Sequence, residues 1–222
     1  TYTIDQIANQ LTEGYWDWSG GSARQWDINH TGSIDIDITS LTTSGQQLAR
    51  WACDAWNNVT GITFNEVNSG QDIYFQDSAS GAYCSSSTSG GYITSSTINV
   101  STSWLNSYGT TINSYSFETY IHEIGHALGL GHGGNYNGSA TYGSDNHYTN
   151  DSVQATIMSY FDGSDNTTID STLYYNNALV VSPMVADILA VHNLYGTPTS
   201  VQTGDTTYGY NSNAGGYLNN LA

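Results

Sequence analysis

Apolar residues recur every three or four positions in three stretches of the chain, a spacing typical of amphipathic helices. These stretches span residues 4–11, 43–59 and 183–195. Thr and Ser, which commonly cap helices, open the second stretch, and Pro183 suits the first turn of the third. Glycines follow each stretch and are expected to end the helices: Gly14, Gly61 and Gly196.

Strands are predicted between the first two helices and after the second. Isoleucines alternate with aspartates over residues 34–38, which indicates a half-buried strand. Residues 62–67, 72–75 and 92–100 also have the composition of strands, whereas the Ser- and Gly-rich stretch 78–91 is interpreted as a loop.

Composition excludes several classes of partner. The chain has 222 residues, enough for one large domain or two small ones, and its formal net charge is −17 with only two basic residues, Arg24 and Arg50. A chain with so few cations lacks the basic face that nucleic acids or anionic membranes require.

No window approaches 18 apolar residues, so no transmembrane helix is expected, and the start of the chain does not resemble a signal peptide.

The chain has two cysteines, Cys53 in the second predicted helix and Cys84 in the predicted loop. In a secreted protein such a pair favours one disulfide, which is our expectation. The alternative is two buried free thiols.

One motif carries the chemistry. Residues 122–132 read H-E-x-x-H-x-x-G-x-x-H, in a segment predicted to be helical from about Phe117. Histidines four residues apart lie on one face of a helix, so His122 and His126 can reach the same metal ion. Gly129 lets the chain turn and bring back His132 as a third nitrogen ligand. Three imidazoles with one open position describe a catalytic Zn²⁺ site. The alternative is a helix whose histidines are paired with backbone groups.

Glu123 lies between the first two histidines in sequence. It is placed to take a proton from the attacking water, which makes it the candidate general base. A Thr-Ile-Met-Ser-Tyr segment, residues 156–160, follows downstream.

Together these two motifs resemble the metzincin metallopeptidases, and within them the serralysin family. The resemblance implies an α+β fold in which a twisted mixed sheet packs on two long helices above a zinc cleft, with mostly helix and loop below. It implies that Met158 forms the Met-turn, a bend beneath the metal, and that Tyr160 is a further, mobile zinc ligand whose hydroxyl helps to stabilise the tetrahedral intermediate. It also implies that an edge strand at about 97–102 lines the cleft.

Some positions differ from the pattern of the family, and the resemblance does not decide the role of others. Serralysins generally lack cysteines, and Gly133 stands where they usually have proline, which is expected to loosen that turn. Asp151 resembles an acidic residue of the family that supports the site, although a surface aspartate is an equal alternative. His30, His147 and His192 are interpreted as structural.

The resemblance divides the chain into a catalytic domain, residues 1–202, and a tail, residues 203–222. The tail resembles the joint at which serralysins enter a calcium-binding roll, whose repeat does not appear here. Bound Ca²⁺ is therefore only an implication of the family.

These observations predict a secreted, extracellular zinc endopeptidase of broad specificity. It is expected to be a monomer whose partners are protein and peptide substrates. The main alternative is a zinc-dependent binding or adhesive module that kept the site without the activity. Among rival enzymes, Tyr160 argues against matrixin-like peptidases. Gly133 and the tail argue against astacin-like ones.

Overall fold

The computed structural model describes residues 1–166 and 179–221. The chain starts with a helical run made of α1 (Ile4–Asn9), a π-helical turn (Gln10–Gly14) and α2 (Tyr15–Ser19). The prediction that the helix ends at Gly14 is wrong. The helical run continues to Ser19 and ends at Gly20, which adopts the left-handed conformation. The side chain of Gln10 fills the space that a Cβ atom on Gly14 would need, with its Oε1 atom 2.5 Å from that position. The glycine therefore accommodates the wide turn and does not end the helix.

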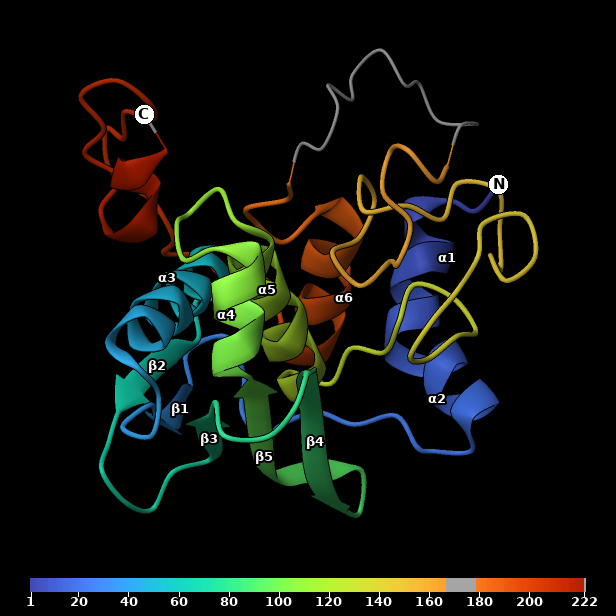
Figure 1. The fold of residues 1–222 in the computed structure, drawn as a ribbon, viewed down its shortest axis with the longest axis horizontal. Coiled ribbons are helices and arrows are strands. Elements are labelled where there is room, and N and C mark those ends of the chain that lie inside the picture. Colours follow the sequence, from blue (N-terminus) through green and yellow to red (C-terminus); the bar gives the residue numbers. More distant parts are fainter. Residues whose placement is uncertain (167–178, 222) are drawn as a thin grey trace.

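Five strands form one mixed sheet in the order β2-β1-β3-β5-β4 (Figure 1). They are β1 (Ser33–Asp37), β2 (Thr63–Glu66), β3 (Ile73–Gln76), β4 (Ala82–Ser89) and β5 (Tyr92–Val100). Neighbouring strands are parallel except β4, which runs antiparallel to β5 at one edge.

Strand β4 corrects two predictions. The stretch expected to be a loop forms this strand, and the edge role expected for residues 97–102 belongs to β4, because β5 lies inside the sheet. Gly90 and Gly91 join β4 to β5 with φ angles of 60° and 85°, the backbone that a tight two-residue hairpin requires. A hydrogen bond of 2.7 Å between the hydroxyls of Ser86 and Ser96 links the two strands. Polar pairs of this kind leave no hydrophobic alternation in the sequence.

Two long helices, α3 (Thr43–Thr60) and α5 (Tyr115–Ala127), pack against each other and against the sheet (Figure 1). The Nε1 atom of Trp56 in α3 donates to the carbonyl of Ile121 in α5 at 2.9 Å. Trp56, Phe75, Phe117 and Tyr120 are fully buried between these elements. The α+β class predicted from the sequence is confirmed.

Three further helices complete the described chain. A short helix α4 (Thr102–Tyr108), which the sequence pattern did not indicate, connects β5 to α5. Helix α6 (Val185–Tyr195) begins two residues later than predicted, because the Asp187 carboxylate accepts the N–H of Met184 at 2.7 Å and makes Met184 the cap. A 3-10 turn (Gly216–Asn220) lies in the tail, where buried Tyr217 packs on Phe117 with ring centroids 5.9 Å apart. No helix within residues 1–166 and 179–221 is long and apolar enough to cross a membrane.

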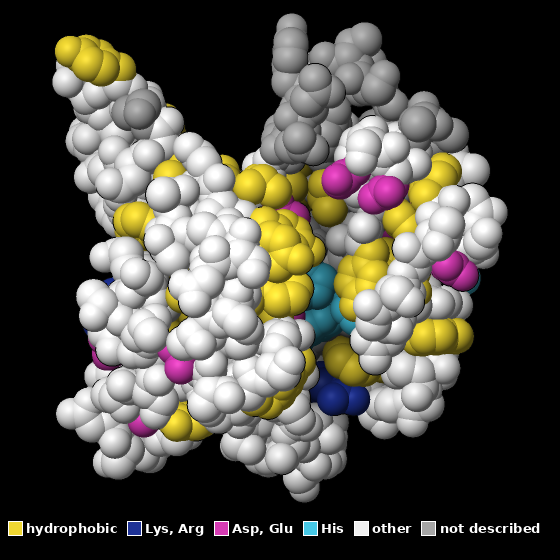
Figure 2. Space-filling view, in the orientation of Figure 1, with side chains coloured by type: hydrophobic (Ala, Val, Ile, Leu, Met, Phe, Trp, Pro, Cys, Tyr) yellow, Lys and Arg dark blue, Asp and Glu magenta, His cyan; other side chains and the backbone are white. Residues whose placement is uncertain are grey.

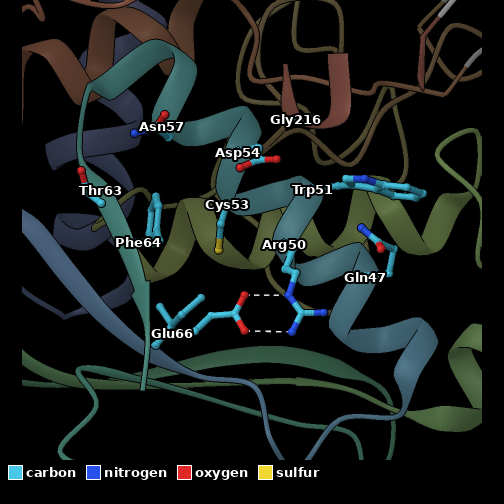
Figure 3. A pocket seen from close by; sticks show the side chains of 11 residues that line it. Gln47, Arg50, Trp51, Cys53, Asp54, Asn57, Thr63, Phe64, Glu66 and Gly216 are labelled. Atoms are coloured by element: carbon cyan, nitrogen blue, oxygen red, sulfur yellow. Dashed lines mark hydrogen bonds and ion pairs between the residues drawn. The ribbon is translucent and has the colours of Figure 1, made fainter. Parts of the chain in front are cut away.

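The predicted disulfide is wrong, because Cys53 and Cys84 are free thiols. Cys53 lines a cavity of about 460 Å³ beside β1 and β2, above the ion pair of Arg50 and Glu66 (Figure 3). Cys84 lies on β4, three strands beyond β1 in the sheet order. Cys53 lies on α3 beside β1 and β2, whereas β4 is at the other edge of the sheet, so the two thiols are not brought together as a disulfide requires.

Candidate metal centre

Helix α5 presents the first two histidines. Its start is capped by the Ser114 hydroxyl, which accepts the N–H of Phe117 at 3.2 Å, and its apolar face is buried against α3 and the sheet. The opposite face carries His122 and His126 one turn apart. Burial of the apolar face therefore fixes the direction in which both imidazoles point.

The chain then turns sharply to bring back the third histidine. Gly129 has a φ of 101°, and a Cβ atom there would overlap the carbonyl oxygen of Arg24. A Cβ atom on Gly131 would likewise overlap the ring of Tyr15. Only glycine fits at these two positions, and together they let His132 approach the helix.

All three histidines are held by backbone carbonyl groups. The Nδ1 atom of His122 lies 2.9 Å from the carbonyl oxygen of Ile157. That of His126 lies 2.8 Å from the oxygen of Leu130, and that of His132 lies 2.9 Å from the oxygen of Tyr136. Because a carbonyl only accepts, each Nδ1 carries the proton, and each Nε2 keeps a lone pair. The structure thus fixes the tautomer that metal binding requires.

The candidate ligand atoms of the three histidines all lie within 4.8 Å of one another, and the Nε2 atoms of His126 and His132 are 3.1 Å apart. Two nitrogen ligands of one tetrahedral zinc would be roughly 3.4 Å apart, given bonds of about 2.0–2.1 Å. Burial lowers the pKa of all three imidazoles, to about 3 for His126, so they are neutral at physiological pH. The donor set fits Zn²⁺. Within the described residues, it is the only group of three or more His, Cys, Asp or Glu able to hold a metal.

Glu123 lies beside the triad at the wall of a cavity of about 720 Å³, which His122 and Tyr160 also line. Figure 2 shows the histidines at the bottom of a cleft between the two halves of the molecule. The carboxyl group is buried, and its Oε2 atom has no hydrogen-bond partner among the described residues. Burial raises the pKa of this carboxyl to about 8. A cation held by the three histidines would lower this pKa, and the ionised carboxylate would then be placed to accept a proton from a reactant in the cavity.

Tyr160 lies at the rim of the triad, with its ring centroid 4.6 Å from that of His132 and 6.2 Å from that of His122. Its hydroxyl accepts the backbone N–H of Gly138 at 3.2 Å. That bond leaves the phenolic proton available for donation into the cavity.

Met158 is fully buried beneath α5, and Asp187 of α6 holds the bend that carries it. The Asp187 carboxylate accepts the Thr156 hydroxyl at 2.5 Å and the Ile157 N–H at 2.8 Å. Since the carbonyl of Ile157 accepts from His122, a continuous set of hydrogen bonds joins α6 to the first histidine. Sequence analysis missed Asp187, whose partners are about 30 positions away in the chain.

Asp151 is fully buried, so the surface alternative is wrong. One carboxylate oxygen accepts the hydroxyls of Tyr136 at 3.1 Å and Ser159 at 2.7 Å, tying the loop after His132 to the Met158 bend. The expectation that Gly133 loosens this loop is also corrected. Its N–H donates to the carbonyl of Met158 at 2.9 Å, a bond that a proline could not make.

The other histidines have partners away from the triad. His192 Nε2 lies 2.8 Å from the Val59 carbonyl, His30 donates its backbone N–H to Tyr195, and His147 packs edge-on against Tyr2. These contacts agree with the structural roles predicted for them.

The curated proteins that match this chain are metallopeptidases and serralysins. No protein-family model matches the chain. The metallopeptidase AprA of Pseudomonas marginalis is 34% identical over 97% of this chain and 50% of that protein. Serralysin C of Dickeya chrysanthemi is 33% identical over 96% of this chain and 48% of its own length. The chain thus spans about half the length of the curated relatives it matches.

Among solved structures, the hatching enzyme HCE-1, a zinc-protease from Oryzias latipes, aligns with 78% of this chain and 95% of that one. Its sequence identity is 17% and the TM-score is 0.48.

Proposed function

This chain is a homologue of the serralysins along nearly its whole length, and on that premise we propose that it is the catalytic unit of a zinc endopeptidase. Its substrates would be proteins and peptides, cut with broad sequence tolerance. The single observation that carries the proposal is the convergence of three neutral imidazoles on one point, each with its Nδ1–H held by a backbone carbonyl, next to the buried Glu123.

Zinc in this site would supply a Lewis acid that polarises the scissile carbonyl and acidifies the attacking water. The chain supplies the remaining groups. Glu123 takes the proton of the water and returns it to the leaving amine. Tyr160 would be a further ligand of the metal, and its hydroxyl would donate a hydrogen bond to the developing oxyanion.

Strand β4 is the proposed support for the substrate backbone. It is the outer strand of the sheet, and its first residue, Ala82, lines the cavity that contains His122 and Glu123. An edge strand presents unpaired N–H and C=O groups to which an extended peptide can add as a further strand. Backbone pairing of this kind would tolerate many side chains, which is the basis for broad specificity.

The unpartnered carboxyl group of Glu123 supports hydrolysis over the alternative of a zinc-dependent binding module. A buried carboxyl group without a hydrogen bond lowers stability, and metal binding alone does not need it. The wider proposal is a secreted, monomeric protein in which residues 1–202 form the catalytic domain. A calcium requirement belongs to this proposal only as an implication of the family.

Substitution of the general base tests the proposed function. The measurement is cleavage of an internally quenched peptide and of casein by wild-type protein, Glu123→Gln and, as a matched control, Glu13→Gln on the exposed face of the first helical run. Each protein is analysed for zinc, before and after chelation and zinc restoration.

We expect Glu123→Gln to retain zinc but lose nearly all cleavage, and the control to match the wild-type rate. Chelation should abolish wild-type cleavage, and zinc should restore it. Equal rates for Glu123→Gln and wild type would refute the mechanism. A zinc-loaded wild-type protein that cleaves neither substrate would favour the binding module.

A further inference from the structure

The active-site cavity contains an acidic group that the proposed chemistry does not use. Glu118 lies on α5 one turn before His122, so both side chains share a helix face, and both line the cavity. Its Oε2 atom accepts the N–H of Val180 at 2.7 Å. Within residues 1–166 and 179–221, Oε1 of Glu118 accepts no hydrogen bond.

Aromatic rings form a wall of the same cavity. Trp104 of α4 and Tyr115 of α5 stack with centroids 5.9 Å apart and an interplanar angle of 29°. The Trp104 Nε1 atom donates to the Thr119 hydroxyl at 3.1 Å, which fixes the orientation of the indole. Flat aromatic faces next to a carboxylate are the surroundings in which cationic side chains are commonly bound.

The charge along the cleft is polarised. Besides His122 and the catalytic Glu123, the charged residues that line the cavity are Glu118 of α5 and Asp162 after the Met158 bend, both acidic; α4 and β4 contribute no charged residue. Arg24, one of two basic residues in the chain, lies at the other end of α5, where its carbonyl packs against Gly129. Figure 2 shows a basic group at that end of the histidine cleft. A substrate cation is therefore attracted to one end of the cleft and repelled from the other.

Burial also leaves the Glu118 carboxylate without full solvation. Burial is the main cause that raises the pKa of this carboxyl to about 7; the hydrogen bond from Val180 lowers the pKa and the nearby Asp162 raises it, both by less. A cation in the cavity would offset this desolvation.

We propose that Glu118, with the Trp104–Tyr115 wall, forms a subsite for an arginine or lysine side chain of the substrate next to the scissile bond. The inference deepens the proposed peptidase function and rests on it. Because the carboxylate already bonds to Val180 through one oxygen, the cation would pair with the other. The aromatic wall would contact the aliphatic stem and the face of a guanidinium.

Matched peptides separate the charge of the side chain from its shape. The cleavage sites of zinc-loaded wild-type protein in an unstructured peptide library are first mapped by mass spectrometry. Each position flanking the scissile bond is then occupied by arginine or by citrulline, a neutral group of nearly the same shape. The ratio of kcat/KM for the two peptides is measured at pH 8, where Glu118 is ionised, for wild type, Glu118→Gln and Glu13→Gln.

We expect wild type and Glu13→Gln to prefer arginine at one flanking position by roughly tenfold, the usual effect of a charge-assisted hydrogen bond. Glu118→Gln should bring the ratio close to one. The glutamine amide oxygen can still accept from Val180, so the fold should be retained. A wild-type ratio near one at every flanking position, or a preference that survives Glu118→Gln, would overturn the subsite.

Binding provides a second measurement that does not depend on turnover. Zinc-loaded Glu123→Gln and Glu118→Gln/Glu123→Gln are titrated with both peptides, and Trp fluorescence gives each Kd. Tighter binding of the arginine peptide only when Glu118 is present supports the subsite. Failure of wild type to cleave any peptide would count against the peptidase function, and the Kd ratio would still decide the subsite.

Discussion

Met158 and Gly125 are in direct contact beneath the three histidines. A Cβ atom added to Gly125 would lie 2.6 Å from the Sδ atom of Met158 and 3.1 Å from the indole ring of Trp56. Gly125 stands between His122 and His126 in the helix, so its lack of a side chain lets the Met158 bend approach the ligand-bearing turn. The close approach explains why a residue with poor helix propensity occupies the centre of α5.

Gly125→Ala should therefore destabilise the protein. Overpacking costs about 1–3 kcal/mol and opposes the gain of about 1 kcal/mol that alanine brings to a helix. We expect a lower Tm and weaker zinc binding, measured by thermal unfolding with and without zinc. Gly204→Ala is the control, because nothing lies within 4 Å of the added Cβ. A Tm equal to or above wild type would show that the contact is not tight.

Asp187→Ala should weaken both the fold and the metal site. It removes the acceptor for the N–H groups of Ile157 and Met184 and for the Thr156 hydroxyl. Each donor left unsatisfied in the interior costs about 1–3 kcal/mol, so we expect a loss of several kcal/mol in urea unfolding. Zinc affinity should fall as well, because Ile157 orients His122. Asp187→Asn keeps an acceptor oxygen, so its stability and zinc affinity should lie between those of wild type and Asp187→Ala. Unchanged zinc affinity in a folded Asp187→Ala protein would separate this network from the metal site.

Tyr160→Phe should lower turnover with little effect on stability. The change removes the hydroxyl that accepts from Gly138 and that we propose donates to the oxyanion. Loss of one such donor typically lowers kcat by roughly 10²–10³. Steady-state kinetics on a quenched peptide measures the effect, with Tyr210→Phe, 86% exposed, as the control. Wild-type kcat in Tyr160→Phe would remove this residue from the mechanism.

The stability of the zinc-free protein should rise as pH falls from 8.5 to 6.5. Burial raises the pKa of Glu118 to about 7 and that of Glu123 to about 8, both above the ordinary value of 4.5, so the folded state binds more protons than the unfolded state in this range. The stabilisation is present at low pH and is lost as pH rises through about 7 to 8. Below about 6.5 the depressed pKa values of the three histidines act in the opposite direction.

Urea unfolding of chelated protein at pH 8.5, 7.5 and 6.5 measures this dependence. Glu118→Gln should show a smaller gain over the same range, because it removes one titrating group. An identical slope in the variant would mean that the Glu118 carboxyl does not titrate as its burial requires.

Local spacing explains which parts of the site were predictable. His122, His126 and Glu123 lie within two turns of one helix, and Gly129 marks the turn that returns His132, so sequence distance translates directly into geometry. Hydrophobic periodicity likewise located α3 and most of the strands. These features depend on neighbours in the chain.

The features that sequence reasoning missed depend on residues far apart in the chain. The predicted Cys53–Cys84 disulfide fails because the sheet order places β4 at the edge opposite β2. Strand β4 was missed because its side chains do not alternate in polarity, and Ser86 bonds instead to Ser96 of the neighbouring strand β5. Asp187 acts on residues that only the packing of α6 brings near.

The carbonyl groups that orient the three histidines have a consequence for sequence drift. Ile157, Leu130 and Tyr136 contribute main-chain oxygens, which every amino acid possesses, so replacing their side chains does not delete these acceptors. The path of the backbone therefore sets the orientation of the ligands, and most point mutations leave that orientation unchanged. The glycines that set this path, Gly129 and Gly131, carry the constraint instead, because a side chain at either position would displace the backbone that holds the imidazoles.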